Sequence, residues 1–437
     1  MLNRNRDDML NGTSDHPPSY YAATATGTLE AKPLTEELEC DVCVVGGGYT
    51  GLSAALHLAR NGVKVALLEQ GPAGWGASGR NGGQVHVGIR RGQYWIEKHL
   101  GLQHARALWN QALRAREHLD WLITTYGIDC DLKPGLLHAA HKQRHVLESH
   151  RYAEHLRRTY DYEHIRCVDR EEMHSLVASQ GYLGGTLDTR GGHLHALNLA
   201  LGIGRAAQAH GAALYENTRV VGVTRRGGEW EVETQGGRVR SRQVLLACNG
   251  YLRGLSRTVE RRVMPINNYI AVTEPLGETR ANELVRHGYA VADSRFVVYY
   301  FRMTPDHRLL FGGGENYSYK FPRDIASYVR RHINRVFPQL SCVAIDYAWG
   351  GTLAITPSRL PFIRELEPGL YNASGYSGMG VVLAPYLGRV VAQAMLGDRN
   401  DFAQWSGIPV ARFPGGVAFR APTLIAAMSL AAWRDRI

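Results

Sequence analysis

The stretch CDVCVVGGGYTGLSAALHLARNGVKVALLEQ, residues 40–70, decides the fold of this chain. Residues 41–45 form a short, valine-rich apolar run, which is typical of a strand buried on both faces of a parallel sheet. The leucines and alanines of residues 52–58 then recur at helical intervals, and a second apolar run at 63–68 ends in Glu69. This order of strand, helix and strand predicts a βαβ unit with a parallel sheet.

Three glycines between the first strand and the helix have the spacing G-x-G-x-x-G. Gly46 allows a tight turn, Gly48 lets a pyrophosphate approach the backbone, and Gly51 lets the helix pack against the strand. The pyrophosphate would meet free N–H groups at the positive end of the helix dipole. Glu69, eighteen positions after Gly51, can accept hydrogen bonds from both ribose hydroxyls. The stretch therefore predicts an adenine dinucleotide site, for NAD or for FAD.

Length and charge narrow the class of protein. The chain has 437 residues and a net charge of +10, and its length predicts two intertwined domains. The pairs of arginines are scattered, and no basic run with interleaved aromatic side chains occurs, so we expect no nucleic-acid partner. The six cysteines lack the spacing of a secreted scaffold, and roughly the first 35 residues contain no apolar signal core, which favours a cytoplasmic protein.

Membrane insertion is not expected from the sequence. No apolar run reaches the ~18 residues that a membrane-spanning helix needs, so we expect no transmembrane segment. The longest candidate, residues 423–433, is interpreted as a terminal helix that docks on the body of the protein or on a partner. Peripheral contact of this helix and of the basic surface with a membrane is the less favoured alternative.

Two further glycine-rich stretches favour FAD over NAD. GASGRNGGQ, residues 76–84, allows the close backbone approach that a ribityl chain and a flavin edge require, with a flexible surface loop as the alternative. GYSGMG, residues 375–380, opens an apolar helix that runs to Leu396. The N-terminus of such a helix would face the pyrimidine edge and stabilise the negative charge of the reduced flavin. Together the two stretches predict that the dinucleotide is FAD.

The order of these segments predicts the architecture. Nucleotide-type segments occur at the start, middle and end of the chain, and strand-like segments of a second sheet lie between them. We therefore predict an α/β fold in which a Rossmann-type FAD-binding domain is interleaved with an α+β substrate domain built on an antiparallel sheet. The expected division is a loosely ordered arm at 1–35, an FAD-binding domain at 36–100, 196–255 and 345–400, a substrate domain at 101–195 and 256–344, and a C-terminal extension at 401–437.

These motifs, with others along nearly the whole chain, resemble the FAD-dependent amine and amino-acid oxidases of the D-amino-acid oxidase and sarcosine oxidase type. Within that family the chain looks most like the γ-glutamylputrescine oxidase group. The further stretches that carry the resemblance are SYYAATA (19–25), GWGASGRNGGQ (74–84), GGHLHALNLA (191–200), YFRMTPDHRLLFGGG (300–314), FPQL (337–340), FPGG (413–416) and RDRI (434–437).

The resemblance implies a reaction and a mode of cofactor binding. It implies oxidation of a primary or secondary amine, such as γ-glutamylputrescine or a related polyamine or amino-acid conjugate, by hydride transfer to flavin N5. Hydrolysis of the imine would give an aldehyde, and O2 would become hydrogen peroxide. Sarcosine oxidases bond their flavin to a cysteine just before a Thr-Pro segment, where this chain reads GGTLAITPSR, so a non-covalent FAD is expected. An amino-acid or opine-type dehydrogenase that passes electrons to a respiratory carrier is the alternative.

The motifs and the resemblance together name the residues expected at the cofactor. Asn249 and Gly250 match the family's strand terminus, and Val220 or Val221 would meet the adenine through its backbone. The full expected set is Gly46, Gly48, Tyr49, Thr50, Gly51, Glu69, Gln70, Gly76, Ala77, Ser78, Arg80, Asn81, Gly82, Gly83, Gln84, Val221, Asn249, Gly250, Gly375, Tyr376, Ser377, Gly378, Met379, Gly380 and Val381.

Met379 departs from the family pattern, which reads G-Y-S-G-H-G with histidine at this position. A methionine neither donates a hydrogen bond nor carries charge. We therefore expect the flavin edge or the substrate pocket to differ here, and we count Met379 among the candidate catalytic residues.

Candidate substrate residues come from one strand-like stretch, VVYYFRMTP. Flavin-dependent amine oxidation relies on alignment of the C–H bond, so we expect positioning residues and no obligatory catalytic triad. Arg302 is the first choice for binding a substrate carboxylate, with an ordinary strand arginine as the alternative. Tyr300, with Tyr299 and Tyr269, is expected to wall an aromatic pocket or to pack in the core.

Two histidines lie in the arrangement that metal ligands sometimes have. His193 and His195 are two positions apart, which on a strand places both side chains on one face. No further His, Cys or acidic cluster lies close to them in the sequence. They are therefore interpreted as structural or pocket residues, and no metal is expected.

Overall fold

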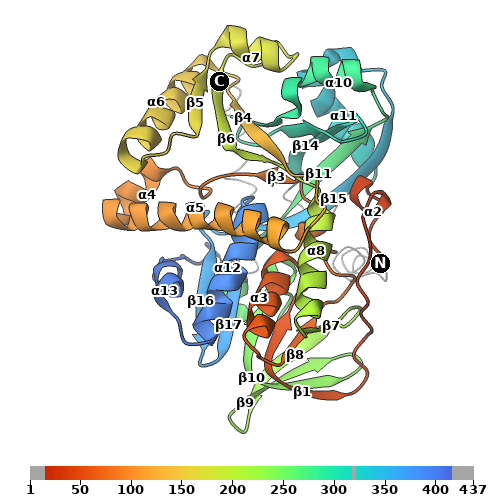
Figure 1. The fold of residues 1–437 in the computed structure, drawn as a ribbon, viewed down its shortest axis with the longest axis vertical. Helices are drawn as coiled ribbons and strands as arrows, with labels where there is room; N and C mark the ends of the chain where they lie inside the picture. Colours follow the sequence, from red (N-terminus) through yellow and green to blue (C-terminus); the bar gives the residue numbers. More distant parts are fainter. Residues whose placement is uncertain (1–14, 317–320, 416–437) are drawn as a thin grey trace.

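The computed structural model describes residues 15–316 and 321–415, and these residues build two sheets that follow one another along the long axis of the molecule (Figure 1). The first sheet has eight strands in the described chain, in the order β16-β17-β10-β1-β2-β7, with a β8–β9 hairpin joined to β10. Its strands are β1 (Glu37–Val45), β2 (Val65–Leu68), β7 (Ala213–Tyr215), β8 (Val220–Arg226), β9 (Glu229–Thr234), β10 (Arg238–Leu246), β16 (Phe362–Glu367) and β17 (Leu370–Ser374). β1 pairs in parallel with both β2 and β10, which confirms the predicted βαβ unit.

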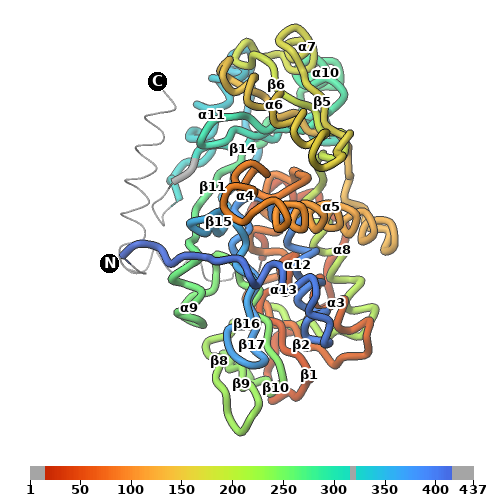
Figure 2. Tube along the Cα trace, turned by 90° about the vertical axis from the view of Figure 1, so that its left-hand side faces the viewer, coloured from red at the N-terminus to blue at the C-terminus, as the bar shows by residue number. Residues whose placement is uncertain are grey.

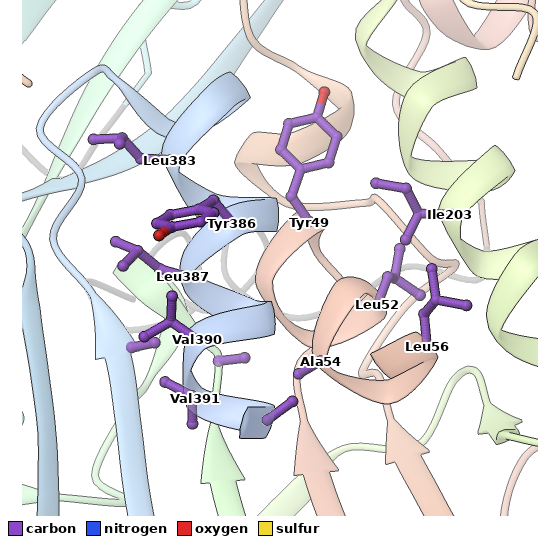
Figure 3. Close-up of a cluster of buried hydrophobic side chains, with 14 of the residues drawn as sticks. Tyr49, Leu52, Ala54, Leu56, Ile203, Leu383, Tyr386, Leu387, Val390 and Val391 are labelled. Carbon is purple, nitrogen blue, oxygen red and sulfur yellow. The ribbon is translucent and has the colours of Figure 1, made fainter. Parts of the chain in front are cut away.

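An apolar layer of helices covers this sheet. Its members are α3 (Tyr49–Arg60), α8 (Ala196–Ala209) and α12 (Gly380–Met395), which lie side by side with α3 in the middle (Figure 3). Leu52 and Leu56 of α3 are fully buried and face Ile203 of α8, and burial of each leucine stabilises the fold by about 1.5–3 kcal/mol. α12 can lie close to α3 because Gly388 has no side chain. A Cβ at this position would come 2.3 Å from the carbonyl oxygen of Thr50.

The second sheet has nine strands in the described chain, in the order β15-β11-β14-β13-β12-β4-β6-β3, with β5 paired to β6. Its strands are β3 (Gln84–Val85), β4 (Lys133–Ala139), β5 (Ile165–Val168), β6 (Gly185–His193), β11 (Met264–Thr273), β12 (Ala290–Asp293), β13 (Tyr300–Met303), β14 (Leu309–Asn316) and β15 (Ile345–Ile355). Among the described strands of this sheet, neighbours pair antiparallel except β12 with β4, so the expected antiparallel sheet is confirmed with one parallel pair.

Of the remaining helices, α13 packs on β16 of the first sheet, and most of the others lie around the second sheet and the junction between the sheets. α5 crosses this junction and packs against α12, while α6 covers β5 and β6 (Figures 1 and 2). Their bounds are α2 (Tyr20–Ala23), α4 (Gln93–Leu100), α5 (Leu102–Thr125), α6 (Gln143–Tyr160), α7 (Arg170–Leu176), α9 (Arg257–Glu260), α10 (Glu278–Leu284), α11 (Ile325–Val336) and α13 (Asn400–Ser406), with short 3-10 turns at Ala77–Gly79, Asn249–Tyr251, Arg286–Gly288 and Pro338–Leu340.

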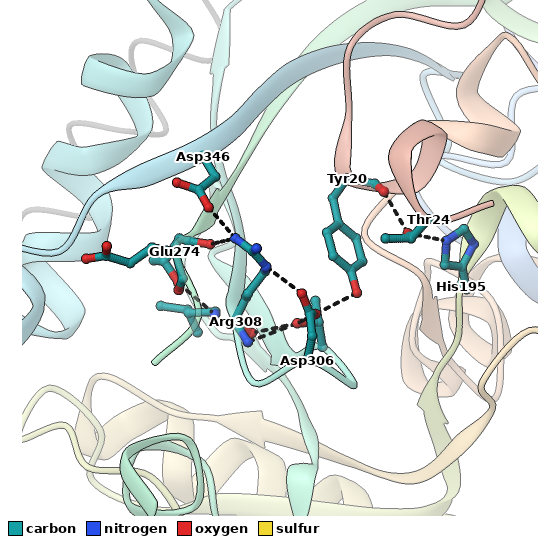
Figure 4. Close-up of polar contacts among 10 residues, drawn as sticks. Tyr20, Thr24, His195, Glu274, Asp306, Arg308 and Asp346 are labelled. Atoms are coloured by element: carbon teal, nitrogen blue, oxygen red, sulfur yellow. Dashed lines mark hydrogen bonds and ion pairs between the residues drawn. The ribbon is translucent and has the colours of Figure 1, made fainter. Parts of the chain in front are cut away.

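The N-terminal arm is not loosely ordered where the structure describes it. Tyr21 is fully buried, and the hydroxyl of Tyr20 donates to Asp306 at 2.7 Å (Figure 4). Arg308 continues this network by ion pairs of 2.5 Å to both Asp306 and Asp346. Two tyrosines bury enough apolar surface to hold a short segment, so residues 15–35 belong to the body. Residues 1–14 and the predicted helix at 423–433 lie outside the described residues.

Several sequence-based boundaries were wrong. β15 was expected in the FAD-binding domain but pairs with β11, and α5 was expected in the substrate domain but joins the core of α3 and α12. Apolar patterning defines an element and its buried face, but the same pattern suits either sheet, so it leaves the partner undefined.

Among the described helices, none alone is long and apolar enough to cross a membrane. Only the pair α12 and α13, bent by 115°, has a suitable length and composition, and nearly all of α12 is buried in the core.

Candidate active site

A cavity of about 680 Å³ runs between the two sheets. One half is lined by the glycine-rich segments, by residues 218–221 and by residues 247–249, and we call it the nucleotide half. The other half, which we call the far chamber, lies between one face of the second sheet and helices α5 and α6. The far chamber is lined by His86, Arg90, Trp109, His138, Tyr152, Leu156, Tyr162, Thr186, Asp188 and neighbouring residues.

The N-terminus of α3 forms one wall of the nucleotide half. Gly48 precedes the helix without a side-chain cap, and the N–H of Tyr49 donates to the hydroxyl of Ser78 at 2.9 Å. A Cβ at Gly48 would lie 2.8 Å from that hydroxyl oxygen, and one at Gly46, where φ is +113°, would lie 2.8 Å from the carbonyl oxygen of Ala247. The helix N-terminus is thus bare of any cap from its own side chains, and apart from the N–H of Tyr49, which donates to Ser78, it is open to an anion.

Glu69 ends β2 at the same wall. Its carboxylate accepts hydrogen bonds from the N–H groups of Gly47 at 2.6 Å and Gly71 at 3.1 Å. Burial raises the pKa of Glu69 to about 7, against the opposing effect of these two bonds. The backbone thus fixes the carboxylate where it lines the cavity, with residues 218–221 lining the same half.

The loop of residues 76–84 is ordered by its own polar side chains, so the alternative of a flexible surface loop is wrong. Arg80 donates through Nε to the carbonyl of Trp75 at 2.6 Å, and its guanidinium lies 4.1 Å from the centre of that indole ring. Asn81 accepts from the N–H of Gly83 and donates to the carbonyl of Ser78, both at 2.8 Å. The loop presents backbone and small side chains to the cavity without collapsing into it.

The N-terminus of α12 forms the opposite wall. Met379 precedes this helix without a side-chain cap, after Ser377 with a φ of +54° and Gly378 with a φ of +96°. Tyr376 shares a hydrogen bond of 2.6 Å with Thr50, which joins this turn to the start of α3. A second bare helix N-terminus therefore lines the cavity, as the sequence predicted.

Most of the residues predicted for the cofactor come together around this one cavity. Those that line it are Gly46, Gly48, Tyr49, Thr50, Glu69, Gln70, Gly76, Ala77, Ser78, Arg80, Asn81, Gly82, Gln84, Val221, Asn249, Tyr376, Ser377, Gly378, Met379, Gly380 and Val381. The predicted residues outside its lining are Gly51, Gly83, Gly250 and Gly375. These four lie behind the wall; for example, a Cβ at Gly51 would come 1.9 Å from the carbonyl oxygen of Gly46.

Arg302 lies away from the cavity, and the geometry gives no support to its expected role as a carboxylate ligand. It is only 1% exposed and is absent from the cavity lining. Its guanidinium donates to the carbonyls of Gly82 at 3.3 Å and Leu194 at 3.2 Å, and to the hydroxyl of Tyr21 at 3.3 Å. Arg302 therefore joins the N-terminal arm to the loop of residues 76–84, a third outcome that the sequence did not suggest.

The tyrosines divide between the two expected outcomes. Tyr300 lines the cavity, and its hydroxyl donates to Asn268 at 2.5 Å. Tyr299 bonds to His332 at 2.8 Å, and both Tyr299 and Tyr269 are buried in the hydrophobic core of the second sheet. Of these three tyrosines, only Tyr300 can therefore contact a ligand in the cavity.

The two histidines do not share a strand face. His193 ends β6 and bonds to the carbonyl of Gly288 at 2.9 Å, whereas His195 caps α8 by accepting from the N–H of Asn198. The expected common face is wrong because β6 ends between them. Over the described ranges, no three His, Cys, Asp or Glu side chains form a group that could hold a metal ion.

The residues of the far chamber were not predicted from the sequence. Thr186 and Asp188 of β6 both line it, because residues two apart on a strand share a face, and His138 of the neighbouring β4 lies opposite Thr186. An aspartate within an otherwise buried strand was the one available signal. The other lining residues come from distant loops and helices and carry no local pattern.

The nucleotide half fits an adenine dinucleotide that carries a flavin. A pyrophosphate fits at the bare N-terminus of α3, a ribose fits beside Glu69, and a flavin edge fits at the N-terminus of α12. Two sheets, one with this nucleotide half and one with the far chamber, define a two-domain flavoprotein oxidoreductase.

Comparison with known sequences gives the family. The model of the family described as FAD dependent oxidoreductase matches residues 41–394, and the chain belongs to this family. It is therefore an FAD-dependent enzyme, and its cofactor is FAD.

Two relatives and one solved structure illustrate the likeness. The chain is 39% identical to "Probable oxidoreductase OrdL" of Rhizobium meliloti (strain 1021), over 96% of this chain and 97% of the relative. It is 37% identical to "Gamma-glutamylputrescine oxidoreductase" of Escherichia coli (strain K12), over 97% of this chain and 99% of the relative. The crystal structure of glycine oxidase from Geobacillus kaustophilus shares the fold, with a TM-score of 0.70 and 22% identity over 82% of this chain and 95% of that one.

Proposed function

We propose that this protein is an oxidase of amines of the γ-glutamylputrescine class. The observation that carries the proposal is the continuous cavity, whose lining extends from the nucleotide half into a far chamber walled by side chains of the second sheet and of helices α5 and α6. The 37% identity to the γ-glutamylputrescine oxidoreductase over nearly the full length of both chains supports the same class.

In this proposal the chain contributes mainly by positioning. FAD, when bound, supplies the two-electron oxidation of the carbon–nitrogen bond and passes the electrons to O2, which becomes hydrogen peroxide. The N-termini of α3 and α12 orient the cofactor, and Tyr300, held by Asn268, limits how a substrate approaches it. Apolar Met379 adds no charge beside the helix N-terminus, so binding of the neutral amine is favoured there.

The cofactor is proposed to be bound without a covalent link. None of the six cysteines lies in the segment 350–359, and Cys248, which does line the cavity, is partly buried, and desolvation raises the pKa of its thiol. A thiol held in its protonated form is a poor nucleophile. All six cysteines are unpaired, which also suits the cytoplasm as the proposed compartment.

The test is the visible spectrum of the purified holoenzyme before and after anaerobic addition of γ-glutamylputrescine. We expect flavin bands that this amine bleaches and that acid precipitation of the protein releases into the supernatant. Readmission of air should restore the bands and yield one hydrogen peroxide per amine oxidised. Bands that persist with γ-glutamylputrescine but vanish with another amine would contradict the substrate class, and reduction of a dye without peroxide would favour a dehydrogenase.

A further inference from the structure

Asp188 is a buried carboxylate in the wall of the far chamber. It is 4% exposed, and Oδ1 accepts three hydrogen bonds, from the hydroxyl of Tyr162 at 2.8 Å and from the N–H groups of Arg190 at 2.9 Å and Gly191 at 3.1 Å. Within the described chain, no Lys, Arg or His nitrogen forms an ion pair with Asp188, and no hydrogen bond reaches Oδ2. One oxygen of a buried carboxylate is thus left to the cavity.

A buried carboxylate without a counter-charge is costly unless a ligand supplies one. The other carboxylate of the far chamber, Asp293, already has its partner, because it forms an ion pair with Arg295. The two histidines of the chamber do not supply a positive charge to Asp188. Burial lowers the pKa of His86 to about 3, and it also lowers the pKa of His138. Because no cationic side chain of the described residues forms an ion pair with Asp188, an ammonium group of a bound molecule can supply the pairing charge.

The position of Asp188 indicates which part of that molecule carries the charge. β6 runs from Asp188 to His193, which pairs with Gln84 beside the loop of residues 76–84. Five residues of extended strand rise about 16 Å, so Asp188 lies about that far along the sheet from this loop, where the proposed function puts the flavin edge. A molecule that reaches both places has to be long, and its second cationic nitrogen would lie at the far end.

We propose that Asp188 binds the α-ammonium group of an aminoacyl headgroup at the far end of the substrate. This inference rests on the proposed function and extends it to the substrate's second end. Arg90 lines the same chamber and, like Asp188, acts electrostatically on His138, so a headgroup with both an ammonium and a carboxylate group meets both charges. The aromatic rings of Trp109 and Tyr162, 5.2 Å apart and edge to face, lie alongside the headgroup.

The experiment compares two substrates in the holoenzyme and its Asp188→Asn variant. γ-Glutamylputrescine carries the α-ammonium group, and glutarylputrescine is the same molecule without it. An asparagine keeps an oxygen for the three bonds to Oδ1 and removes only the charge. Glu171→Gln is the matched control, because it removes one carboxylate charge at an exposed position of α7 outside the cavity lining.

We expect Asp188→Asn to raise KM for γ-glutamylputrescine at least about tenfold, as loss of a charge-assisted hydrogen bond does, and to change kcat less than about twofold. Its KM for glutarylputrescine should equal that of the unmodified enzyme, and Glu171→Gln should leave the KM values for both substrates unchanged. An equal rise for both substrates, or no rise for either, would overturn the subsite while leaving the proposed function intact. A wild-type flavin that γ-glutamylputrescine does not bleach would overturn both proposals.

Discussion

The two halves of the cavity are built in different ways. The nucleotide half is mostly backbone: two bare helix N-termini and a loop whose glycines leave no room for a Cβ. The far chamber is mostly side chain, with a carboxylate, histidines and aromatic rings that come from strands, helices and a loop far apart in the sequence. Backbone groups can bind a cofactor through the same surface in many proteins, whereas recognition of one particular substrate depends on particular side chains. The two halves should therefore respond differently to mutation.

The largest effect is expected where backbone packs on backbone, at Gly51. In Gly51→Ala the new methyl group would lie 1.9 Å from the carbonyl oxygen of Gly46, so α3 has to move away from β1. We expect a loss of about 3 kcal/mol or more in the free energy of unfolding, together with loss of bound flavin. Urea unfolding and the ratio of flavin to protein absorbance measure the two effects.

Gly181→Ala is the control for this prediction. A Cβ at Gly181 meets only the hydroxyl of Ser179 at 3.5 Å, which is an ordinary contact. We expect this variant to keep its flavin and its stability. Equal behaviour of the two variants would show that the close packing at Gly51 is not what holds the nucleotide half in shape.

Substitution of Arg302 should have the next largest effect, and it tests whether this arginine has a structural role or binds the substrate. Arg302→Met leaves the carbonyls of Gly82 and Leu194 without this donor, so we expect a loss of about 2–4 kcal/mol in the free energy of unfolding. The KM of the surviving holoenzyme should stay within about twofold, because the side chain does not line the cavity. Arg331→Met, at an exposed arginine, is the control for loss of charge alone. A selective rise in KM for carboxylated amines would restore the role expected from the sequence.

The different construction also explains what the sequence could reveal. The glycine motif predicted the nucleotide half because turn, helix start and close approach are local properties of a few consecutive residues. Gly46, Gly48 and Glu69 lie where the motif requires them, and the turn before α12 has the bare N-terminus that its glycines suggested. Local backbone chemistry is what a sequence motif encodes.

The far chamber depends instead on pairing between distant strands. Asp188 and His138 meet because β6 pairs with β4, some fifty residues away, and helix α6 then closes the space. Arg302 was misjudged for a similar reason: its strand was predicted, but the approach of Gly82 and Tyr21 to the guanidinium arises only in the folded chain. Alternation along a strand shows which residues share a face, and not what packs on that face.

The raised pKa of Glu69, in the nucleotide half, predicts that the stability of the apoprotein depends on pH. Its pKa is raised from an ordinary 4.5 to about 7 in the folded apoprotein, so the folded state holds a proton that the unfolded state releases. Glu69 therefore contributes to the free energy of unfolding in full below about pH 4.5. This stabilisation, roughly 3 kcal/mol in total, is lost as the pH rises through 7. Urea unfolding of the apoprotein between pH 5 and pH 8 should show the decline, and Glu69→Gln should flatten it. A decline of the same size in both proteins would assign it to another group.

The smallest expected effect tests whether the two walls of the nucleotide half are held together. Thr50 and Tyr376 share a buried hydrogen bond of 2.6 Å between the start of α3 and the turn before α12. Tyr376→Phe and Thr50→Val should each cost about 1 kcal/mol, and the double variant should cost less than their sum, since either change alone breaks the bond. Thermal unfolding of the four apoproteins gives the coupling. A coupling near zero would mean that the cofactor, rather than this bond, holds the two helix N-termini at the distance that a flavin dinucleotide needs.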